Sequence, residues 1–231
     1  MGKLAFLFPG QGAQVVGMGK DFFDTYDLAK KRFAEADEAL GYSISKLCFE
    51  GPADRLQLTE HTQPAILTVA VIASELLRAE GIEPEIAAGH SLGEYAALVA
   101  AGVLSFQDAV LLVHKRGAYM QEAVPVGEGA MAAVIGLDDE TIISACVEAS
   151  AAGAVQAVNF NCPGQTVIAG TAKGVETAVQ MLQEKGAKKA VILPVSAPFH
   201  STLMEPAAKK LAAELDKVEL HDAAFPVVSN Y

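Results

Sequence analysis

Hydrophobic positions in the first half of the chain alternate between short apolar runs and longer segments with helical spacing. Residues 3–8 form an apolar run that stops at Pro9-Gly10, which predicts a buried strand. The next segments repeat apolar residues every three or four positions, which predicts helices. The expected helices span residues 28–40, 62–80, 94–101 and 105–122, and a second strand spans 85–89. Strands that alternate with helices indicate a mainly parallel sheet.

The pattern changes after residues 125–129, a Pro- and Gly-containing segment that is typical of a linker. The next elements follow the order strand, helix, strand, strand, helix, strand, which is the ferredoxin-like split unit. They are expected at residues 131–135, 138–150, 155–160, 166–169, 173–184 and 190–194. We therefore expect one large α/β domain of residues 1–126 and 196–231, with residues 127–195 inserted as a small subdomain.

Composition narrows the class of protein. The 231 residues are 52% hydrophobic and 19% charged, which is typical of a folded chain and excludes a disordered one. A formal net charge of −11 repels phosphates, so neither nucleic acid nor a membrane surface is an expected partner. The chain has no apolar run of membrane-spanning length and no secretory signal at its start.

The cysteines and histidines give no metal-binding pattern. The three cysteines are widely spaced and form no C-x-x-C pair, which favours a reducing cytoplasm over a disulfide framework. None of the five histidines belongs to an H-E-x-x-H motif. We expect no metal.

The strongest chemical signal is Gly89-His90-Ser91-Leu92-Gly93, which follows an expected strand and precedes an expected helix. A serine in such a sharp turn is the nucleophile elbow of the α/β-hydrolase-like fold, and the flanking glycines let strand and helix approach. The large domain is therefore expected to be α/β-hydrolase-like and catalytic. The spacing by itself is equally compatible with an ordinary tight turn.

A serine nucleophile needs a base, and His200 is the best candidate. It precedes a helix expected near Thr202, at the junction of the two expected domains, where pockets form. The alternative is a histidine that only packs against its loop. His90 is expected to point away from the nucleophile and to be structural.

Two further features are open to two interpretations each. Gln11 lies in a glycine turn after the first strand. This turn is either a simple connection or a loop whose N–H groups complete an oxyanion hole. This turn is not a dinucleotide fingerprint, because Val15 stands where that motif needs Gly. It is not a P-loop either, because Met18 stands where a P-loop needs Lys. Arg116 lies beside the apolar stripe of its helix, where it either reaches water or pairs with an anion such as a substrate carboxylate.

A polar segment follows in the small subdomain. Asn159, Asn161 and residues 163–165 are expected to form a polar turn between two strands. Turn chemistry is one interpretation, and lining of the cleft between the domains is the other.

Taken together, these motifs resemble the bacterial malonyl-CoA:acyl carrier protein transacylases of fatty acid synthesis, whose fold also occurs in polyketide synthase acyltransferase domains. The resemblance covers the whole chain. It rests on residues 8–12, 62–65, 89–94, 116, 159–165 and 196–201, which occur in this order.

The resemblance implies a role for each site residue. Ser91 carries the malonyl ester, and His200 acts first as base and then protonates the coenzyme A thiolate. Gln11 and the Leu92 N–H form the oxyanion hole, and Arg116 pairs with the free malonyl carboxylate. The phosphopantetheine thiol of acyl carrier protein then attacks the ester in a ping-pong cycle. His90 and Asn159 are implied to contact substrate, with His90 tied to the preference for a small acyl group.

The resemblance also implies a cytoplasmic monomer with malonyl-CoA and acyl carrier protein as partners, and no cofactor beyond the coenzyme A thioester. Lysines that flank the last helix of the subdomain are a candidate docking patch for the acidic carrier protein. They are Lys173, Lys185, Lys188 and Lys189, and the alternative is that they are ordinary solvated surface lysines.

The family is longer at its C-terminus, where a downstream carbonyl orients the histidine, whereas this chain stops at Tyr231. Two alternatives stay open. One is a serine hydrolase or thioesterase that uses Ser91 and His200 with water as acceptor. The other, which follows from the missing C-terminal segment, is an inactive fragment that binds carrier protein.

Overall fold

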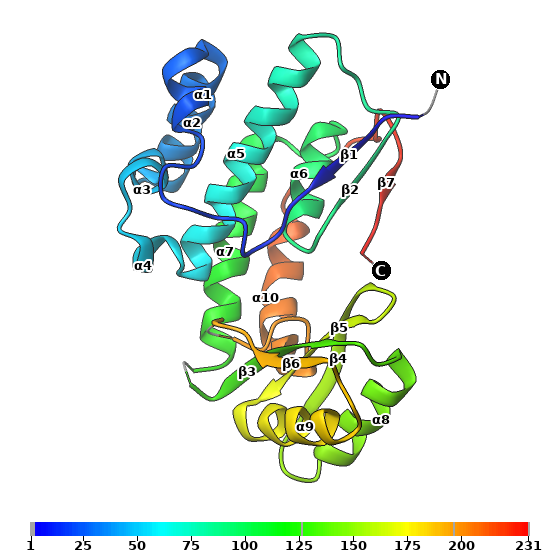
Figure 1. The fold of residues 1–231 in the computed structure, drawn as a ribbon. Coiled ribbons are helices and arrows are strands. Elements are labelled where there is room, and N and C mark those ends of the chain that lie inside the picture. Colours follow the sequence, from blue (N-terminus) through cyan, green and yellow to red (C-terminus); the bar gives the residue numbers. More distant parts are fainter. Residues whose placement is uncertain (1–2, 126, 196, 231) are drawn as a thin grey trace. The chain divides into compact units, whose positions relative to one another are not determined.

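The computed structural model describes residues 3–125, 127–195 and 197–230, and the chain divides into two compact units (Figure 1). The first comprises Met1–Ala118 and Leu211–Tyr231, and the second comprises Tyr119–Lys210. The predicted domain boundaries at 126/127 and 195/196 stay a prediction. Val126 of the expected linker and Ser196 of the 196–201 motif lie outside the described residues.

The first unit is a mixed α/β structure. Its elements are β1 (Ala5–Phe8), α1 (Lys20–Thr25), α2 (Asp27–Leu40), α3 (Ile44–Glu50), α4 (Ala53–Leu56), α5 (Thr59–Ala79), β2 (Ile86–Gly89), α6 (Gly93–Ala100), most of α7 (Phe106–Ala123), the end of α10 (Glu205–Leu215) and β7 (Val227–Val228).

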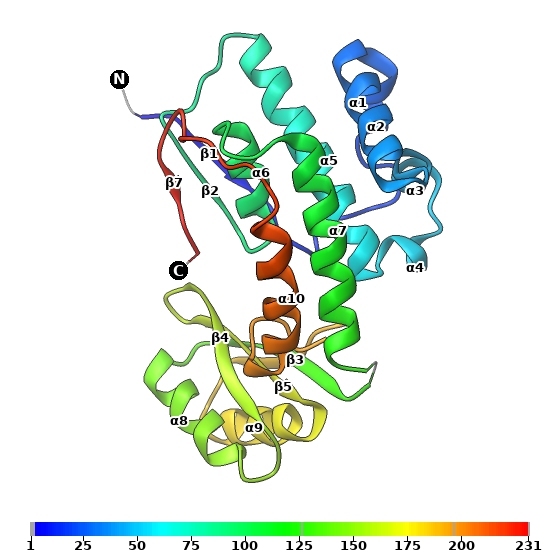
Figure 2. The ribbon, with the colours of Figure 1, turned by 180° about the vertical axis from the view of Figure 1, so that it is seen from behind.

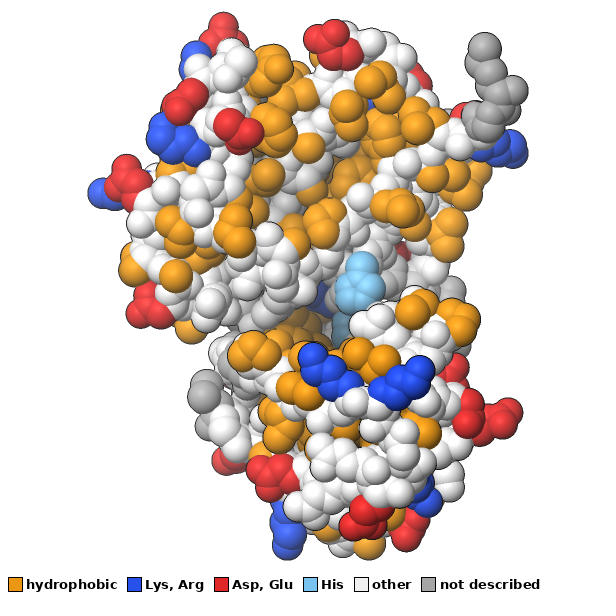
Figure 3. All heavy atoms as spheres, viewed as in Figure 1, with side chains coloured by type: hydrophobic (Ala, Val, Ile, Leu, Met, Phe, Trp, Pro, Cys, Tyr) orange, Lys and Arg blue, Asp and Glu red, His pale blue; other side chains and the backbone are white. Residues whose placement is uncertain are grey.

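The three strands of the first unit form a parallel sheet in the order β1-β2-β7, as the alternation of strands and helices predicts. Phe6 and Phe8 point to the buried face, where α6 packs against β1 and β2. Leu7 points to the opposite face and is 77% exposed. Figure 3 shows apolar side chains gathered over this part of the first unit. The carboxyl end of β2 leads into the turn that holds Ser91.

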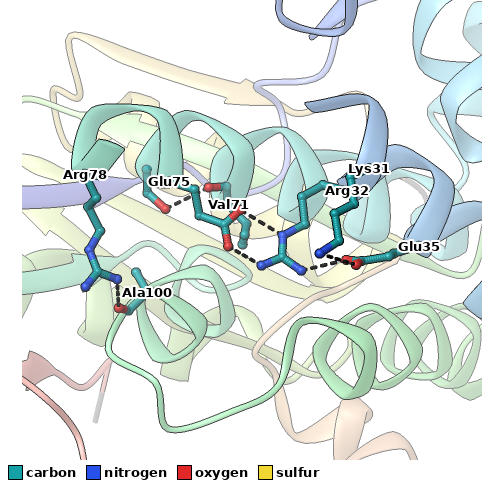
Figure 4. A network of polar contacts seen from close by, with 8 residues as sticks. Lys31, Arg32, Glu35, Val71, Glu75, Arg78 and Ala100 are labelled. Atoms are coloured by element: carbon teal, nitrogen blue, oxygen red, sulfur yellow. Dashed lines mark hydrogen bonds and ion pairs between the residues drawn. The ribbon is translucent and has the colours of Figure 1, made fainter. Parts of the chain in front are cut away.

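Helix α5 contributes to this core, and an ion pair with α2 and a hydrogen bond to α6 hold it in place (Figure 4). Arg32 on α2 donates from Nε and Nη2 to the two carboxylate oxygens of Glu75 on α5, at 2.8 and 2.6 Å. Its Nη1 donates to Glu35 at 2.6 Å. Arg78 on α5 donates to the carbonyl of Ala100 at the end of α6, at 3.1 Å. The carboxylate of Glu75 raises the pKa of the Arg32 guanidinium, which therefore stays charged.

The second unit contains the expected ferredoxin-like subdomain. Its elements are the end of α7, β3 (Gly129–Ile135), α8 (Asp139–Ala149), β4 (Val155–Cys162), β5 (Gln165–Thr171), α9 (Ala172–Glu184), β6 (Lys189–Ile192), a 3₁₀ turn (Thr202–Met204) and the start of α10. The sheet is antiparallel in the order β4-β5-β3-β6, which confirms the fold predicted from the order of elements.

Both faces of this sheet are covered within the second unit. On one face, α8 and α9 bury Ile142 and Leu182 against Ile168 of β5. On the other, Val167 packs in a cluster with Phe199 and residues of α7 and α10. Phe199 therefore fixes the loop that carries His200 to this sheet.

The structure adds three short helices to the predicted elements and corrects one expectation. The pattern does not predict α1, α3 and α4, because helices of four to seven residues complete too few turns to show a helical period. Asn159 and Asn161 do not form a turn but lie inside β4, and only Pro163-Gly164 separates β4 from β5. The pairing of β4 with β5 shifts register between Ala157 and Asn159 and again between Phe160 and Cys162, so the strand continues through both asparagines with two bulges.

Candidate active site

Ser91 occupies the sharp turn between β2 and α6 that the sequence predicts. Its φ is +50°, a left-handed conformation that is rare for a residue with a side chain. A Cβ on Gly89 would lie 1.9 Å from the carbonyl carbon of Gly93, and one on Gly93 would lie 2.2 Å from the carbonyl oxygen of Phe8. Neither glycine tolerates a side chain, so the turn is as tight as a nucleophile elbow requires.

Arg116 on α7 contacts the Ser91 hydroxyl. Its Nη2 donates to Ser91 Oγ at 3.1 Å, and its Nη1 donates to Oε1 of the buried Gln63 on α5 at 2.9 Å. The guanidinium lies 5.8 Å from the ring centroid of Tyr95. Among the described residues, no carboxylate forms an ion pair with Arg116, and burial lowers the pKa of its guanidinium. A cation with neutral partners therefore lies beside the hydroxyl, where a substrate carboxylate would find a partner.

The close approach of α5 and α7 brings Gln63 and Arg116 together. Both views in Figures 1 and 2 show these helices side by side. Gly117 makes this possible, because a Cβ there would lie 2.6 Å from the carbonyl oxygen of Thr59. A larger residue after Arg116 would separate the helices.

The candidate oxyanion donors lie on two segments of the first unit. Leu92 is buried at the start of α6, and its N–H has no hydrogen-bond acceptor among the described residues. Gln11 follows β1, and its Nε2 lies 3.4 Å from Thr59 Oγ1. His90 is exposed, and a Cβ on Gly10 would lie 2.5 Å from the carbonyl oxygen of His90. His90 therefore packs on the loop that carries Gln11, and its part in substrate selection stays a prediction.

His200 and Asn159 belong to the second unit. His200 is exposed and has a φ of +63°. Its loop is held by a hydrogen bond from Ser201 Oγ to the Pro198 carbonyl at 2.7 Å and by one from the Thr202 N–H to Gln156 Oε1 at 3.1 Å. The loop that carries His200 is therefore held in place by hydrogen bonds within the second unit.

Two residues that contact the site were not among the predicted site residues. Gln63 accepts a hydrogen bond from Arg116, and its place in the 62–65 motif of the family resemblance was the available signal. Asn230 accepts a hydrogen bond from the Ser91 N–H at 2.8 Å, and no sequence motif indicates it. Within the described part of the chain, no cluster of His, Cys, Asp or Glu could hold a metal, and no helix is long and apolar enough to cross a membrane.

Comparison with known proteins agrees with this geometry, since residues 5–230 match the acyl transferase domain family. The chain belongs to this family. It is 54% identical to the malonyl CoA-acyl carrier protein transacylase of Bacillus subtilis strain 168, over all of the chain and 73% of that protein. The relative is longer, as the family resemblance led us to expect.

Solved structures of relatives have the same fold as this acyl transferase. An acyl-carrier-protein S-malonyltransferase from Burkholderia pseudomallei 1710b is 53% identical with a TM-score of 0.95, covering 99% of this chain and 75% of that one. A malonyl-transacylase in complex with a type II PKS acyl-carrier protein is 47% identical with a TM-score of 0.96, covering 99% and 74%. The two-part fold predicted from the sequence is thereby confirmed.

Proposed function

We propose that this acyl transferase moves a malonyl group from coenzyme A to the phosphopantetheine thiol of an acyl carrier protein, through an ester on Ser91. The names of the relatives support this substrate pair. The observation that carries the proposal is Arg116, a cation 3.1 Å from the hydroxyl of Ser91 with no carboxylate partner among the described residues. A malonyl group ends in such a carboxylate.

In the first half-reaction, Ser91 Oγ attacks the thioester carbonyl carbon while His200 accepts the hydroxyl proton. A C–O bond forms, and negative charge collects on the carbonyl oxygen, which the Leu92 N–H and Gln11 are proposed to stabilise. Collapse of this intermediate breaks the C–S bond, and His200 gives its proton to the coenzyme A sulfur. Ser91 then carries the malonyl ester.

The second half-reaction repeats these steps with a new nucleophile. The carrier thiol transfers its proton to His200 and attacks the ester carbonyl. The C–O bond to Ser91 breaks, and the proton returns from His200 to Ser91 Oγ. The net change is the transfer of one acyl group between two thiols, and it requires no cofactor beyond the thioester itself.

Arg116 gives a reason for selecting malonyl over acetyl groups. Its guanidinium donates to Ser91 Oγ and Gln63 Oε1. The planar fork suits a carboxylate in two parallel hydrogen bonds, and that pairing replaces the weaker bonds to neutral oxygens. An acetyl group offers no such replacement and leaves the cation unpaired. Asn159 is proposed as a further substrate contact from the second unit.

Lysines on the second unit are proposed to receive the acidic carrier protein. Lys173, Lys185, Lys188 and Lys189 are exposed, and Figure 3 shows basic side chains over the part of this unit that contains β6. Charge reversal at Lys188 and Lys189 should raise the KM for carrier protein and spare the KM for malonyl-CoA. An equal rise in both KM values would contradict this docking site.

Intact mass after incubation with malonyl-CoA tests the proposed function. We expect a malonyl adduct that is absent in Ser91→Ala, and little adduct from acetyl-CoA. An adduct that persists in Ser91→Ala would refute the acyl-serine. Release of free malonate without any acceptor, at a rate that carrier protein does not change, would favour the serine hydrolase instead.

A further inference from the structure

The side chain of Asn230 contacts both flanks of the turn that holds Ser91. Asn230 follows β7, which pairs with β2, and all of these residues belong to the first unit. Its Oδ1 accepts from the Ser91 N–H at 2.8 Å, and its Nδ2 donates to the Gly89 carbonyl at 2.7 Å. One amide group therefore continues, as a side chain, the backbone pairing that β7 makes with β2.

Glu94 fixes the orientation of this amide. Its Oε2 accepts from Asn230 Nδ2 at 2.6 Å and from the Asn230 backbone N–H at 3.2 Å. A carboxylate accepts hydrogen bonds only, so the NH₂ end of the amide must face Glu94. The oxygen end is then directed to the Ser91 N–H. Glu94 lies in the first turn of α6, so the helix after the turn also holds the amide.

Ser91 needs such support because its backbone is strained. A φ of +50° is unfavourable for a residue with a Cβ, and it persists only where the surroundings hold it. The bond to Asn230 also occupies the N–H of Ser91 itself. The Leu92 N–H is then the elbow donor that remains for an oxyanion.

We infer that Asn230 is a positioning residue, which holds the backbone of Ser91 in its left-handed conformation while Glu94 locks the amide. The inference rests on the proposed function, because it assigns Asn230 to the acylation of Ser91. Asn230 is exposed, and hydrogen bonds open to water add little to global stability. Its loss should therefore change the acylation rate more than the stability of the fold.

The first test measures single-turnover acylation by malonyl-CoA, with the reaction quenched and the intact mass recorded. Asn230→Ala should reach the same final adduct about 10- to 100-fold more slowly, since small misplacement of a reacting group costs about that much. The concentration of malonyl-CoA for half-maximal rate should stay near wild type, because Arg116 is untouched. The matched control is Val228→Ala, which truncates an exposed side chain of β7 and should acylate at the wild-type rate.

A second pair of variants gives a readout that general loosening would not produce. Asn230→Asp keeps an oxygen that can accept from the Ser91 N–H. Its second carboxylate oxygen takes the place of Nδ2, which lies 2.6 Å from Glu94 Oε2. Two carboxylates so close share a proton, so the pKa of the pair rises. The acylation rate of this variant relative to wild type should therefore increase as pH falls. Adding Glu94→Gln should abolish this pH dependence and recover part of the rate, because the introduced amide can donate to the introduced carboxylate.

The outcomes separate this inference from the proposed function. Suppose that the wild-type protein forms an adduct that requires Ser91, and that Asn230→Ala acylates at the same rate as wild type. This result would overturn the positioning role and leave the proposed function in place. Absence of any malonyl adduct in wild type would overturn the proposed function and the positioning role with it. If Asn230→Ala does not fold, the pH dependence of Asn230→Asp decides, and a rate ratio to wild type that is flat with pH would refute the role.

Discussion

Replacement of Arg116 by alanine should remove the preference for malonyl-CoA without abolishing acylation. In the wild type, the guanidinium is partly buried beside Ser91 and forms no ion pair with a described residue, so an incoming malonyl carboxylate is its natural partner. Leaving one member of a buried ion pair alone costs about 3–5 kcal/mol, and partial exposure favours the lower value. At 1.36 kcal/mol for each tenfold change, the acylation rate with malonyl-CoA should fall by about 10²-fold.

Acetyl-CoA provides the internal comparison. Its methyl group makes no use of the cation, so the rate with acetyl-CoA should stay unchanged or increase in Arg116→Ala. The assay is the initial rate of adduct formation with each thioester at subsaturating concentration. A suitable control is Arg32→Ala, which removes the ion pair with Glu75 between α2 and α5. This variant should leave the ratio of the malonyl-CoA rate to the acetyl-CoA rate unchanged.

An equal decrease with both thioesters would refute this reasoning. Arg116 also donates to Ser91 Oγ, so such a result would mean that it supports the nucleophile and not the carboxylate. Arg116→Lys separates the two contributions further. A lysine keeps the charge but not the planar fork, so it should retain an intermediate preference for malonyl-CoA.

Three other predictions concern the fold. Gly117→Ala should lower the free energy of unfolding in urea by about 1–3 kcal/mol, because the new methyl would lie 2.6 Å from the backbone of α5. Hydrogen bonds from two lysines lower the pKa of Glu214 from 4.5 to about 2, so its stabilisation is complete above pH 4.5 and is lost as pH falls toward 2. Glu214→Gln should therefore show a flatter decline in stability between pH 5 and pH 3, measured by urea unfolding. Iodoacetamide at pH 8 should alkylate the exposed Cys162 but not Cys48 or Cys146, whose burial raises their pKa values to about 12 and about 11, and mass spectrometry would show the count.

The fold was predictable where one element repeats a pattern over many residues. The long apolar period of α5 and the strand and helix order of the second unit both set their elements within a few residues. The start of α7 also follows from local sequence, because a serine followed three residues later by an acidic residue is typical of a capped helix, and Ser105 Oγ accepts from the Asp108 N–H at 3.1 Å. Asn161 shows the limit, because its polarity suggested a turn, whereas the shifted pairing with β5 keeps it in a strand.

The site was predictable only to the extent that neighbours in sequence are neighbours in space. The turn around Ser91 is local, so its glycines reveal the geometry that the contacts of Gly89 and Gly93 require. The partners of that turn are not local. Gln63 reaches Arg116 because Gly117 lets two helices touch. Asn230 reaches Ser91, which is 139 residues away in the chain, because β7 pairs with β2. Each of these contacts depends on how separate elements pack, and a pattern read along one segment contains no record of that packing. The chemistry of an elbow can thus be inferred from its motif, whereas the groups that hold it in place require the structure.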